Sequence, residues 1–284
     1  MPASPYSSVQ KARDRLAARL VEIRKDAGVK SARELALRLG WHESKVSRIA
    51  NAVTPPSEED VRAWCEACGA ESEIAGLIAS LRLAEGAYVE WRRMERAGLR
   101  AAQESVLPLY ERTRRFRVYE GAVLPGLLQT RGYTRAVLRN VQLNRGLFDD
   151  VEAAVEVRME RQRLLDVRDK TFAFVLEEQA LRTRVADEET MVVQLGHLLT
   201  FAAAKPNISL SIIPGSARRG RSPGEGFWLF DSAQVAVELT GAYLTIREPR
   251  EIRLYEQAFT DHAAVAEHGA GVRNLIAAAI DAVS

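Results

Sequence analysis

Residues 31–51 read SARELALRLGWHESKVSRIAN, and this stretch decides the fold of the N-terminal part of the chain. A helix is predicted to start at Ser31, because Ser31 followed three residues later by Glu34 is a capping box. The helix is predicted to end just before Gly40, because glycine adopts without strain the left-handed conformation that commonly closes a helix.

A second short helix is predicted from about residue 43 to residue 51. Val46 and Ile49 form its apolar side, whereas its other positions are mostly polar or charged. The connection between the two helices is Trp41-His42. Two short helices with so tight a connection, the second one polar on its outer face, are typical of a helix-turn-helix that reads DNA.

Further helices are predicted on both sides of this pair. Apolar residues recur at helical spacing over residues 8–27, 57–69 and 72–96. An all-α helix-turn-helix domain is therefore predicted over residues 8–70.

The charge of the chain is unevenly distributed. Residues 1–57 hold eleven Lys and Arg but five Asp and Glu, a net charge of +6, whereas the remaining residues carry −4. A basic end on a neutral-to-acidic body fits a polyanionic partner such as DNA. A solvated helix surface explains the same charges equally well.

Residues 40–65, GWHESKVSRIANAVTPPSEEDVRAWC, resemble the Cro/CI-type (xenobiotic-response-element, XRE) helix-turn-helix of actinomycete regulators. The resemblance extends over roughly residues 15–70. The family usually has Glu and Gly where this chain has Ala50 and Ala52. Since that Gly normally ends the DNA-reading helix, the turn after Asn51 is expected to differ in detail.

The resemblance makes the second short helix the reading helix, and its residue types suit DNA contacts. Arg48 is the first candidate for base reading, because a guanidinium grips guanine O6 and N7 with two hydrogen bonds. Glu43 is expected to accept from cytosine N4, and Ser44 to reach either type of base. The candidate phosphate contacts, which fix the register of a protein on the duplex, are Lys45, Ser47, Arg33 and Asn51.

The rest of the chain is predicted to form a mixed α/β (α+β) domain over residues 105–284, joined to the first by a helical linker over residues 71–104. Apolar runs and alternation predict strands, and helical periodicity predicts helices. The predicted strands are residues 116–119, 172–176, 208–213, 227–230 and 235–239. One helix is predicted to end near residue 140, and further helices are predicted over residues 149–166, 188–204, 249–266 and 271–283.

This second domain resembles the partner-binding domain of WhiJ-like, antitoxin-like regulators. The matching stretches cover most of residues 105–270 and include VLPGLLQT at 123–130, RMERQ at 158–162, FVLEE at 174–178 and VE at 237–238. The resemblance implies a regulator that acts with a small protein encoded nearby.

Arg182 and Glu238 are the candidate partner-binding residues of this domain. Glu238 ends an apolar strand, so its carboxylate lies either at the rim of the sheet or buried with a mate, since an unpaired buried charge is expensive. Arg182 and Arg247 are the conceivable mates.

The predicted function is a sequence-specific transcription regulator that binds a double-stranded DNA operator as a homodimer, with the second domain serving dimerisation and a small partner protein. Two rival functions stay open. One is an antitoxin that mainly sequesters a small protein, and the other is a small-molecule-responsive repressor with a ligand in an apolar pocket.

No enzymatic activity, cofactor or metal is predicted. The sequence contains no GxSxG, HExxH or Walker motif. Cys65 and Cys68 share one face of a predicted helix without a second ligand pair, so helix packing is favoured over zinc. With two cysteines, no secretory pattern and no apolar run of about twenty residues, the protein is predicted to be cytoplasmic and nucleoid-associated.

Overall fold

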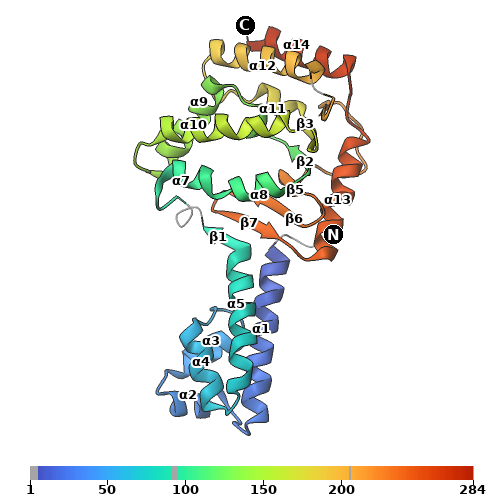
Figure 1. Ribbon diagram of the computed structural model, residues 1–284. Helices are drawn as coiled ribbons and strands as arrows, with labels where there is room; N and C mark the ends of the chain where they lie inside the picture. Colours follow the sequence, from blue (N-terminus) through green and yellow to red (C-terminus); the bar gives the residue numbers. More distant parts are fainter. Residues whose placement is uncertain (1–5, 91–94, 205, 284) are drawn as a thin grey trace. The chain divides into compact units, whose positions relative to one another are not determined.

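The computed structural model describes residues 6–90, 95–204 and 206–283. The chain divides into two compact units, Met1–Val89 and Glu90–Ser284 (Figure 1). Among the described residues, no helix combines the length and the apolar character that crossing a bilayer requires.

The first unit is built from helices, as the sequence predicts. Its elements are α1 (Tyr6–Asp26), α2 (Ala32–Leu39), α3 (Glu43–Ala50), α4 (Glu58–Ala67), the short 3-10 helix η1 (Glu71–Glu73) and α5 (Ile74–Ala87). Leu20, Leu35, Ile49 and Trp64 are almost completely buried between these helices. The indole N–H of Trp64 donates to the carbonyl of Leu20 at 2.9 Å, which ties α4 to α1.

The helix ends follow the capping residues of the sequence. The Ser31 side chain accepts from the Glu34 amide at 3.1 Å at the start of α2. The same helix ends at Gly40, which has φ +66°. Ser57 and Asp60 form a complete capping box at the start of α4. The predicted boundaries of α2 and α3 are therefore confirmed to within a residue.

The stretch predicted as a helical linker, residues 71–104, is divided between the two units. Leu77, Ile78 and Leu81 of α5 are buried in the core of the first unit, because they extend the same apolar face that α1 and α4 bury. The predicted helix 72–96 is correspondingly shorter, and β1 (Tyr88–Glu90) follows it. Residues 91–94 lie outside the described residues.

The second unit contains a mixed six-stranded sheet in the order β7-β6-β5-β2-β3-β4, which confirms the α+β class. The strands are β2 (Arg115–Glu120), β3 (Thr171–Glu177), β4 (Ile208–Ile213), β5 (Phe227–Phe230), β6 (Gln234–Glu238) and β7 (Ala242–Ile246). β2, β3 and β4 are parallel, whereas the pairs β2–β5, β5–β6 and β6–β7 are antiparallel. Asp231 and Ser232 lie in the turn that joins β5 to β6, and Asp231 has φ +53°.

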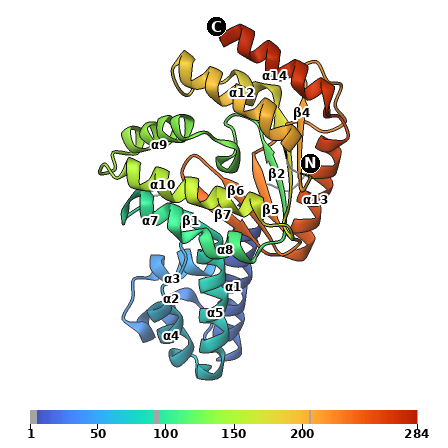
Figure 2. The same cartoon turned by 45° about the horizontal axis from the view of Figure 1, so that its top comes forward.

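Helices cover both faces of this sheet (Figures 1 and 2). They are α7 (Gly98–Ser105), α8 (Leu107–Arg112), η2 (Gly126–Leu128), α9 (Arg131–Arg145), α10 (Val151–Arg161), η3 (Gln162–Asp166), α11 (Glu178–Arg182), α12 (Glu188–Ala204), α13 (Pro249–Ala263) and α14 (Ala270–Val283). α13 lies on one face, where the rings of Tyr119 and His262 stack at 4.0 Å. The main core lies on the other face, where Phe116 stacks on Phe172 at 4.7 Å beneath α8, α11, α12 and α14.

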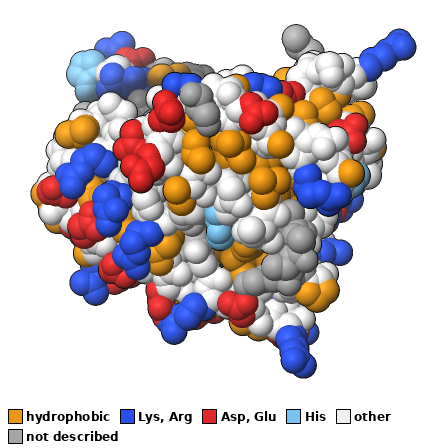
Figure 3. Space-filling model, turned by 90° about the horizontal axis from the view of Figure 1, so that it is seen from above, with side chains coloured by type: hydrophobic (Ala, Val, Ile, Leu, Met, Phe, Trp, Pro, Cys, Tyr) orange, Lys and Arg blue, Asp and Glu red, His pale blue; other side chains and the backbone are white. Residues whose placement is uncertain are grey.

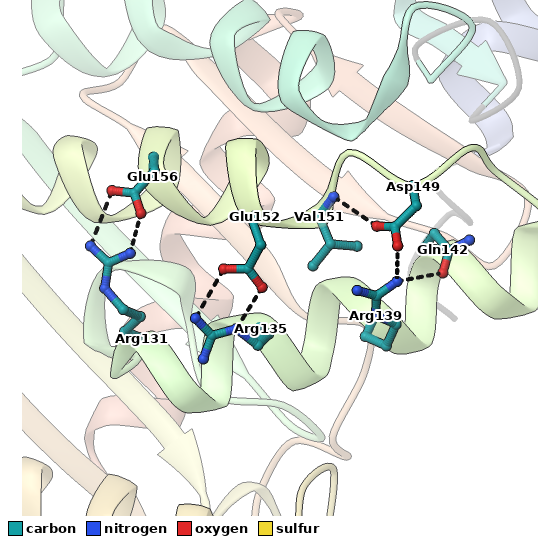
Figure 4. Close-up of polar contacts among 8 residues, drawn as sticks. All are labelled: Arg131, Arg135, Arg139, Gln142, Asp149, Val151, Glu152 and Glu156. Carbon is teal, nitrogen blue, oxygen red and sulfur yellow. Dashed lines mark hydrogen bonds and ion pairs between the residues drawn. The ribbon is translucent and has the colours of Figure 1, made fainter.

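α9 and α10 are held side by side by a ladder of ion pairs (Figure 4). Three arginines four residues apart on one face of α9 meet three carboxylates: Arg131 pairs with Glu156, Arg135 with Glu152 at 2.6 Å, and Arg139 with Asp149 at 2.5 Å. All six side chains are 40–64% exposed, so each pair is individually weak. Together they fix the register of α10 against α9.

The outer surface above α12 and α14 carries charges of both signs. Figure 3 looks down on this face and shows acidic and basic side chains intermixed around an apolar patch. This face therefore lacks the one-sided basic character that a DNA-binding surface requires.

One buried cation, Lys170, caps the C-terminal end of α8. Lys170 is 6% exposed, and its ammonium group donates to the main-chain carbonyls of Tyr110 at 3.3 Å, Glu111 at 2.6 Å and Thr113. The last carbonyls of a helix have no partner within the helix, and a cation is favoured beside them. Lys170 therefore caps α8 from across the chain.

Replacing Lys170 by methionine should lower the free energy of unfolding by about 3 kcal/mol, because buried carbonyls lose a charged donor while the volume stays filled. Urea denaturation measures the change. Arg168→Met, two residues away and exposed, serves as the control and should change stability little. Equal stability of Lys170→Met and the wild type would contradict the capping role.

Candidate nucleic-acid interface

α3 presents one buried side and one exposed side. Val46 and Ile49 are 0% and 2% exposed and contact the core of the first unit. Glu43, Ser44 and Arg48 are exposed on the rest of the helix. The structure therefore places the predicted reading residues on one helix, turned away from the core.

Three of the predicted DNA-contacting side chains have no internal partner. Among the residues that the structure describes, Arg33, Glu43 and Arg48 make no side-chain hydrogen bond or ion pair, and all three are exposed. Arg33 lies in the first turn of α2, and the other two lie on α3. An arginine without a protein partner keeps all five donors for a ligand.

Three other predicted contacts are engaged within α3 itself. His42 is the N-cap residue of α3, and its Nδ1 accepts from the Ser44 amide at 3.3 Å and lies 2.8 Å from the Ser44 hydroxyl oxygen. Asn51 donates from its side-chain amide to the Ser47 carbonyl at 2.8 Å. These contacts stabilise the two ends of the helix, a role that the sequence did not reveal for His42 and Asn51.

Lys45 is held in place by two neighbours. Its ammonium group lies 2.6 Å from Asp60 and 4.0 Å from the centre of the Trp41 ring. Burial raises the pKa of Asp60, but the hydrogen bonds from Lys45 and Ser57 outweigh it and hold that pKa below its usual value. Lys45 thereby links α3 to the N-terminus of α4.

The turn after α3 keeps a glycine-like backbone without a glycine. Ala52 has φ +54°, and its amide donates to the carbonyl of Ile49 at 3.1 Å. The sequence departs from the resembling family at this position, yet the backbone adopts the left-handed conformation that glycine favours. Ala52 is therefore strained where glycine would not be.

Cys65 and Cys68 lie at the end of α4, where helix packing was predicted. Cys65 is completely buried in the core of the first unit, and burial raises the pKa of its thiol to about 11. Within the described part of the chain, no group of three or more His, Cys, Asp or Glu side chains is arranged to hold a metal ion.

In the second unit, Arg182 and Glu238 do not pair with each other. Arg182 pairs with Glu178 one turn earlier on α11, at 2.6 Å. Arg247, the other mate considered for Glu238, donates to Gln234 at 3.1 Å. Both suggested pairings are wrong, because each arginine finds an acceptor closer along its own element or hairpin. Glu238 is exposed at the end of β6.

Glu238 nevertheless acts on a half-buried neighbour, Glu120 at the end of β2. Burial, followed by the negative charge of Glu238, raises the pKa of Glu120 to about 8, although a hydrogen bond from the Trp228 indole at 2.9 Å opposes the shift. The Glu120 carboxyl group is therefore mainly protonated at neutral pH.

The comparisons with known proteins agree with the division of the chain into an N-terminal and a C-terminal unit. Residues 15–75 match a helix-turn-helix domain. Such a domain is a DNA-binding module, so the protein is a DNA-binding regulator. Residues 103–278, more than half of the chain, match a domain of unknown function, DUF5753. The chain belongs to the DUF5753 family.

No curated protein matches the chain. One similar solved structure is that of TrmBL2, described as an archaeal chromatin protein with a novel mode of DNA binding. The sequences are 11% identical, and the similarity covers 84% of this chain and 88% of that chain with a TM-score of 0.33. A TM-score this low carries no argument about the present protein.

Replacing Ala52 by glycine should raise the free energy of unfolding by about 1 kcal/mol, because the left-handed strain of a residue with a Cβ is removed. Ala50→Gly, two residues earlier and inside α3, should instead lower it by about 1 kcal/mol through helix propensity. Urea denaturation followed by circular dichroism distinguishes the two signs. A loss of stability in Ala52→Gly would show that the methyl group of Ala52 contributes more free energy than the left-handed strain costs.

Replacing Glu120 by glutamine should change how stability depends on pH. The raised pKa means that the folded chain binds a proton that the unfolded chain loses, so the wild type loses stability as the pH rises from about 5 to about 8. The glutamine variant lacks this loss. Its stability relative to the wild type should therefore increase with pH, by at most about 1.4 kcal/mol per pH unit.

Urea denaturation at several pH values tests this dependence. Glu111→Gln, at an exposed position, should give a profile parallel to that of the wild type. A parallel profile for Glu120→Gln as well would rule out a protonated carboxyl group at this position.

Proposed function

We propose that the protein is a sequence-specific operator-binding regulator in which α3 enters the major groove of DNA. The observation that carries the proposal is the two-sidedness of α3. Val46 and Ile49 are buried, while Arg48 and Glu43 are exposed and, within the described residues, have no protein partner. A short helix with unpaired base-reading side chains after a tight turn is what a helix-turn-helix uses for recognition.

The contacts of α3 divide the proposed roles. Arg48 is the principal base reader, through guanine, and Glu43 accepts from cytosine N4, with Ser44 as a further base contact. Arg33, Ser47 and Asn51 contact phosphates, which set the register.

Lys45 remains a proposed phosphate contact although it is bound to Asp60. An ammonium group has three donors, and one of them goes to Asp60. The remaining donors are free to meet a phosphate oxygen. The Asp60 contact then orients Lys45 before DNA arrives and reduces the entropy lost on binding.

The DNA-bound form is proposed to be a homodimer. One chain supplies one α3, whereas helix-turn-helix regulators of the Cro/CI type read two half-sites about one helical turn apart. Assignment to the Cro/CI (XRE) type rests on the resemblance of residues 40–65 and forms part of the proposal.

The second unit is proposed to receive the controlling signal through a small protein encoded nearby, with Arg182 and Glu238 at its surface. The WhiJ-like, antitoxin-like resemblance supports this assignment, and both side chains are exposed. The alternative function is an antitoxin that mainly sequesters that protein. Pull-down from the native cell with and without DNA digestion separates the two functions. A partner protein that is retained after digestion, with no DNA enriched in the undigested sample, would favour the antitoxin.

Replacing Arg48 by alanine should weaken binding to the cognate operator by about 1–3 kcal/mol and relax the preference at one base position. Binding to shuffled DNA should change much less, because base readout is absent there. Fluorescence anisotropy titrations measure both affinities, after the operator has been selected from genomic fragments.

Arg62→Ala is the matched control, because Arg62 is an exposed arginine on α4 that pairs with Glu58. Its loss should be small and equal on both DNAs. Equal losses on both DNAs for Arg48→Ala would leave Arg48 only a phosphate contact. No affinity of the wild type for any selected operator at low salt would end the proposal.

A further inference from the structure

The second unit contains a partly open cavity of about 200 Å³ between the helices α7, α8, η2, α9 and α10 on one side and the strands β5, β6 and β7 on the other. Three of the stretches that carry the WhiJ-like resemblance meet at its walls. They contribute Gly126, the pair Arg158 and Arg161, and Glu238. Residues far apart in the sequence are thus gathered around one space.

Arg158 and Arg161 give this cavity its chemistry. They lie three residues apart on one face of α10, and they donate to the neutral side-chain amides of Gln103 and Gln129. Within the described part of the chain, neither makes an ion pair. Arg161 is only 6% exposed, and its Nε has no hydrogen-bond partner.

Two guanidinium groups, one half-buried (Arg158) and one buried (Arg161), that make no ion pair are costly for the protein. Burial, followed by the charge of Arg161, lowers the pKa of Arg158 to about 10, which leaves the Arg158 guanidinium charged at neutral pH. A buried charge normally finds a partner of opposite sign or loses its charge. An anionic ligand beside Arg158 and Arg161 would supply such a partner.

The arginines are held in place from two sides. A Cβ atom on Gly126 would lie 3.3 Å from Nη2 of Arg161 and 3.4 Å from Cδ of Arg158, so η2 approaches them as closely as glycine allows. The Arg161 guanidinium also lies over the Tyr110 ring, 4.6 Å from its centre. On another side of α10, the ladder of Figure 4 fixes the helix against α9. The positive site is therefore built before a ligand binds.

The remaining walls are mainly apolar, with both aliphatic and aromatic residues, and they also carry three acids. Tyr110, Trp228 and Tyr243 line the cavity. Glu95 also lines it; this carboxylate is paired with Arg145, although its Oε2 has no partner. Glu238 is exposed, and Glu120 is mainly protonated at neutral pH.

The size of the cavity limits the ligand. A cavity of about 150 Å³ accommodates benzene. This cavity is somewhat larger, so a ligand of roughly ten non-hydrogen atoms is expected.

We propose that this cavity binds a small aromatic carboxylate, whose carboxylate group is held by Arg158 and Arg161 and whose ring lies against Tyr110 and Trp228. Arginine suits this role because its planar donors match the two oxygens of a carboxylate. The inference corresponds to the small-molecule rival left open by the sequence. It is independent of operator binding, since it concerns residues of the second unit and is tested without DNA.

The test is a thermal-unfolding and calorimetric titration of the full chain with benzoate, 4-hydroxybenzoate and phenylacetate. At least one of them should raise the unfolding temperature saturably, by roughly 3–6 °C at a tenfold excess over its dissociation constant. The uncharged benzamide and the cationic benzylamine have nearly the same shape and should give little or no shift. Inorganic phosphate tests whether charge alone suffices and should also give a much smaller shift.

Variants then locate the site. Arg158→Gln and Arg161→Gln should each reduce the affinity for the responding carboxylate at least about tenfold, as expected when a charged hydrogen-bonded contact is lost. Arg163→Gln, an exposed arginine two residues beyond Arg161, should bind like the wild type. The comparison of carboxylate with amide uses the wild type alone, so it stands even if a variant fails to fold.

Several outcomes would overturn the proposal. They are equal shifts with benzoate and benzamide, a response to benzylamine or phosphate instead of the carboxylates, and unchanged affinity in both glutamine variants. The absence of any saturable response to the three carboxylates at roughly 10 mM, ten times a millimolar dissociation constant, would also overturn it.

Discussion

The burial of Val46 and Ile49 is the constraint on which the DNA-binding unit depends. These two side chains lie on one side of an eight-residue helix and contact a core shared with Leu35 and Trp64. A helix this short has little stability of its own, so tertiary packing decides both that it forms and how it is rotated. Once the apolar pair points inward, Arg48 must point outward. The same packing that stabilises the unit therefore presents the residue proposed to read a base.

Capping and ion pairing then refine what packing begins. His42 and Asn51 hold the two ends of α3, and Lys45 connects it to Asp60 of α4. Each contact is small, but together they limit the rotation of α3 about its axis. Side chains proposed to touch DNA thus also position the helix that carries them. A substitution at Lys45 would consequently change both stability and DNA affinity, whereas Arg48 separates the two effects because its side chain makes no hydrogen bond or ion pair within the described residues.

Local patterns predicted much of this architecture, and long-range placement accounts for what they missed. Capping residues and Gly40 located α2 and α3, and alternating apolar residues located most of the sheet, because these signals act over a few residues. β7 and the helices α8 and α11 were not predicted, whereas most of α7 lies in the stretch predicted as a helical linker. The charged composition near residues 90–100 suggested a linker. The C-terminal end of α8 is capped by Lys170, which lies sixty residues further along the chain. Arg182 and Arg247 were proposed as mates of Glu238, since a sequence does not show which acceptor lies nearer.

No local sequence pattern predicts the cavity. It depends on strand pairing, because the parallel pairing of β2 with β3 brings α10 over the aromatic side of β5. RMERQ at 158–162 has the composition of an ordinary charged helix segment, and only its burial distinguishes Arg158 and Arg161 from the exposed arginines of the ladder. A chain that needed only stability would gain from an apolar residue at either position, since an unpaired buried charge opposes folding. The chain nevertheless keeps both Arg158 and Arg161, beside Gly126, which leaves room for them. This arrangement is explained if an anion supplies the opposite charge. Binding of an anion beside Arg158 and Arg161 would offset that cost and so stabilise the fold of the second unit directly.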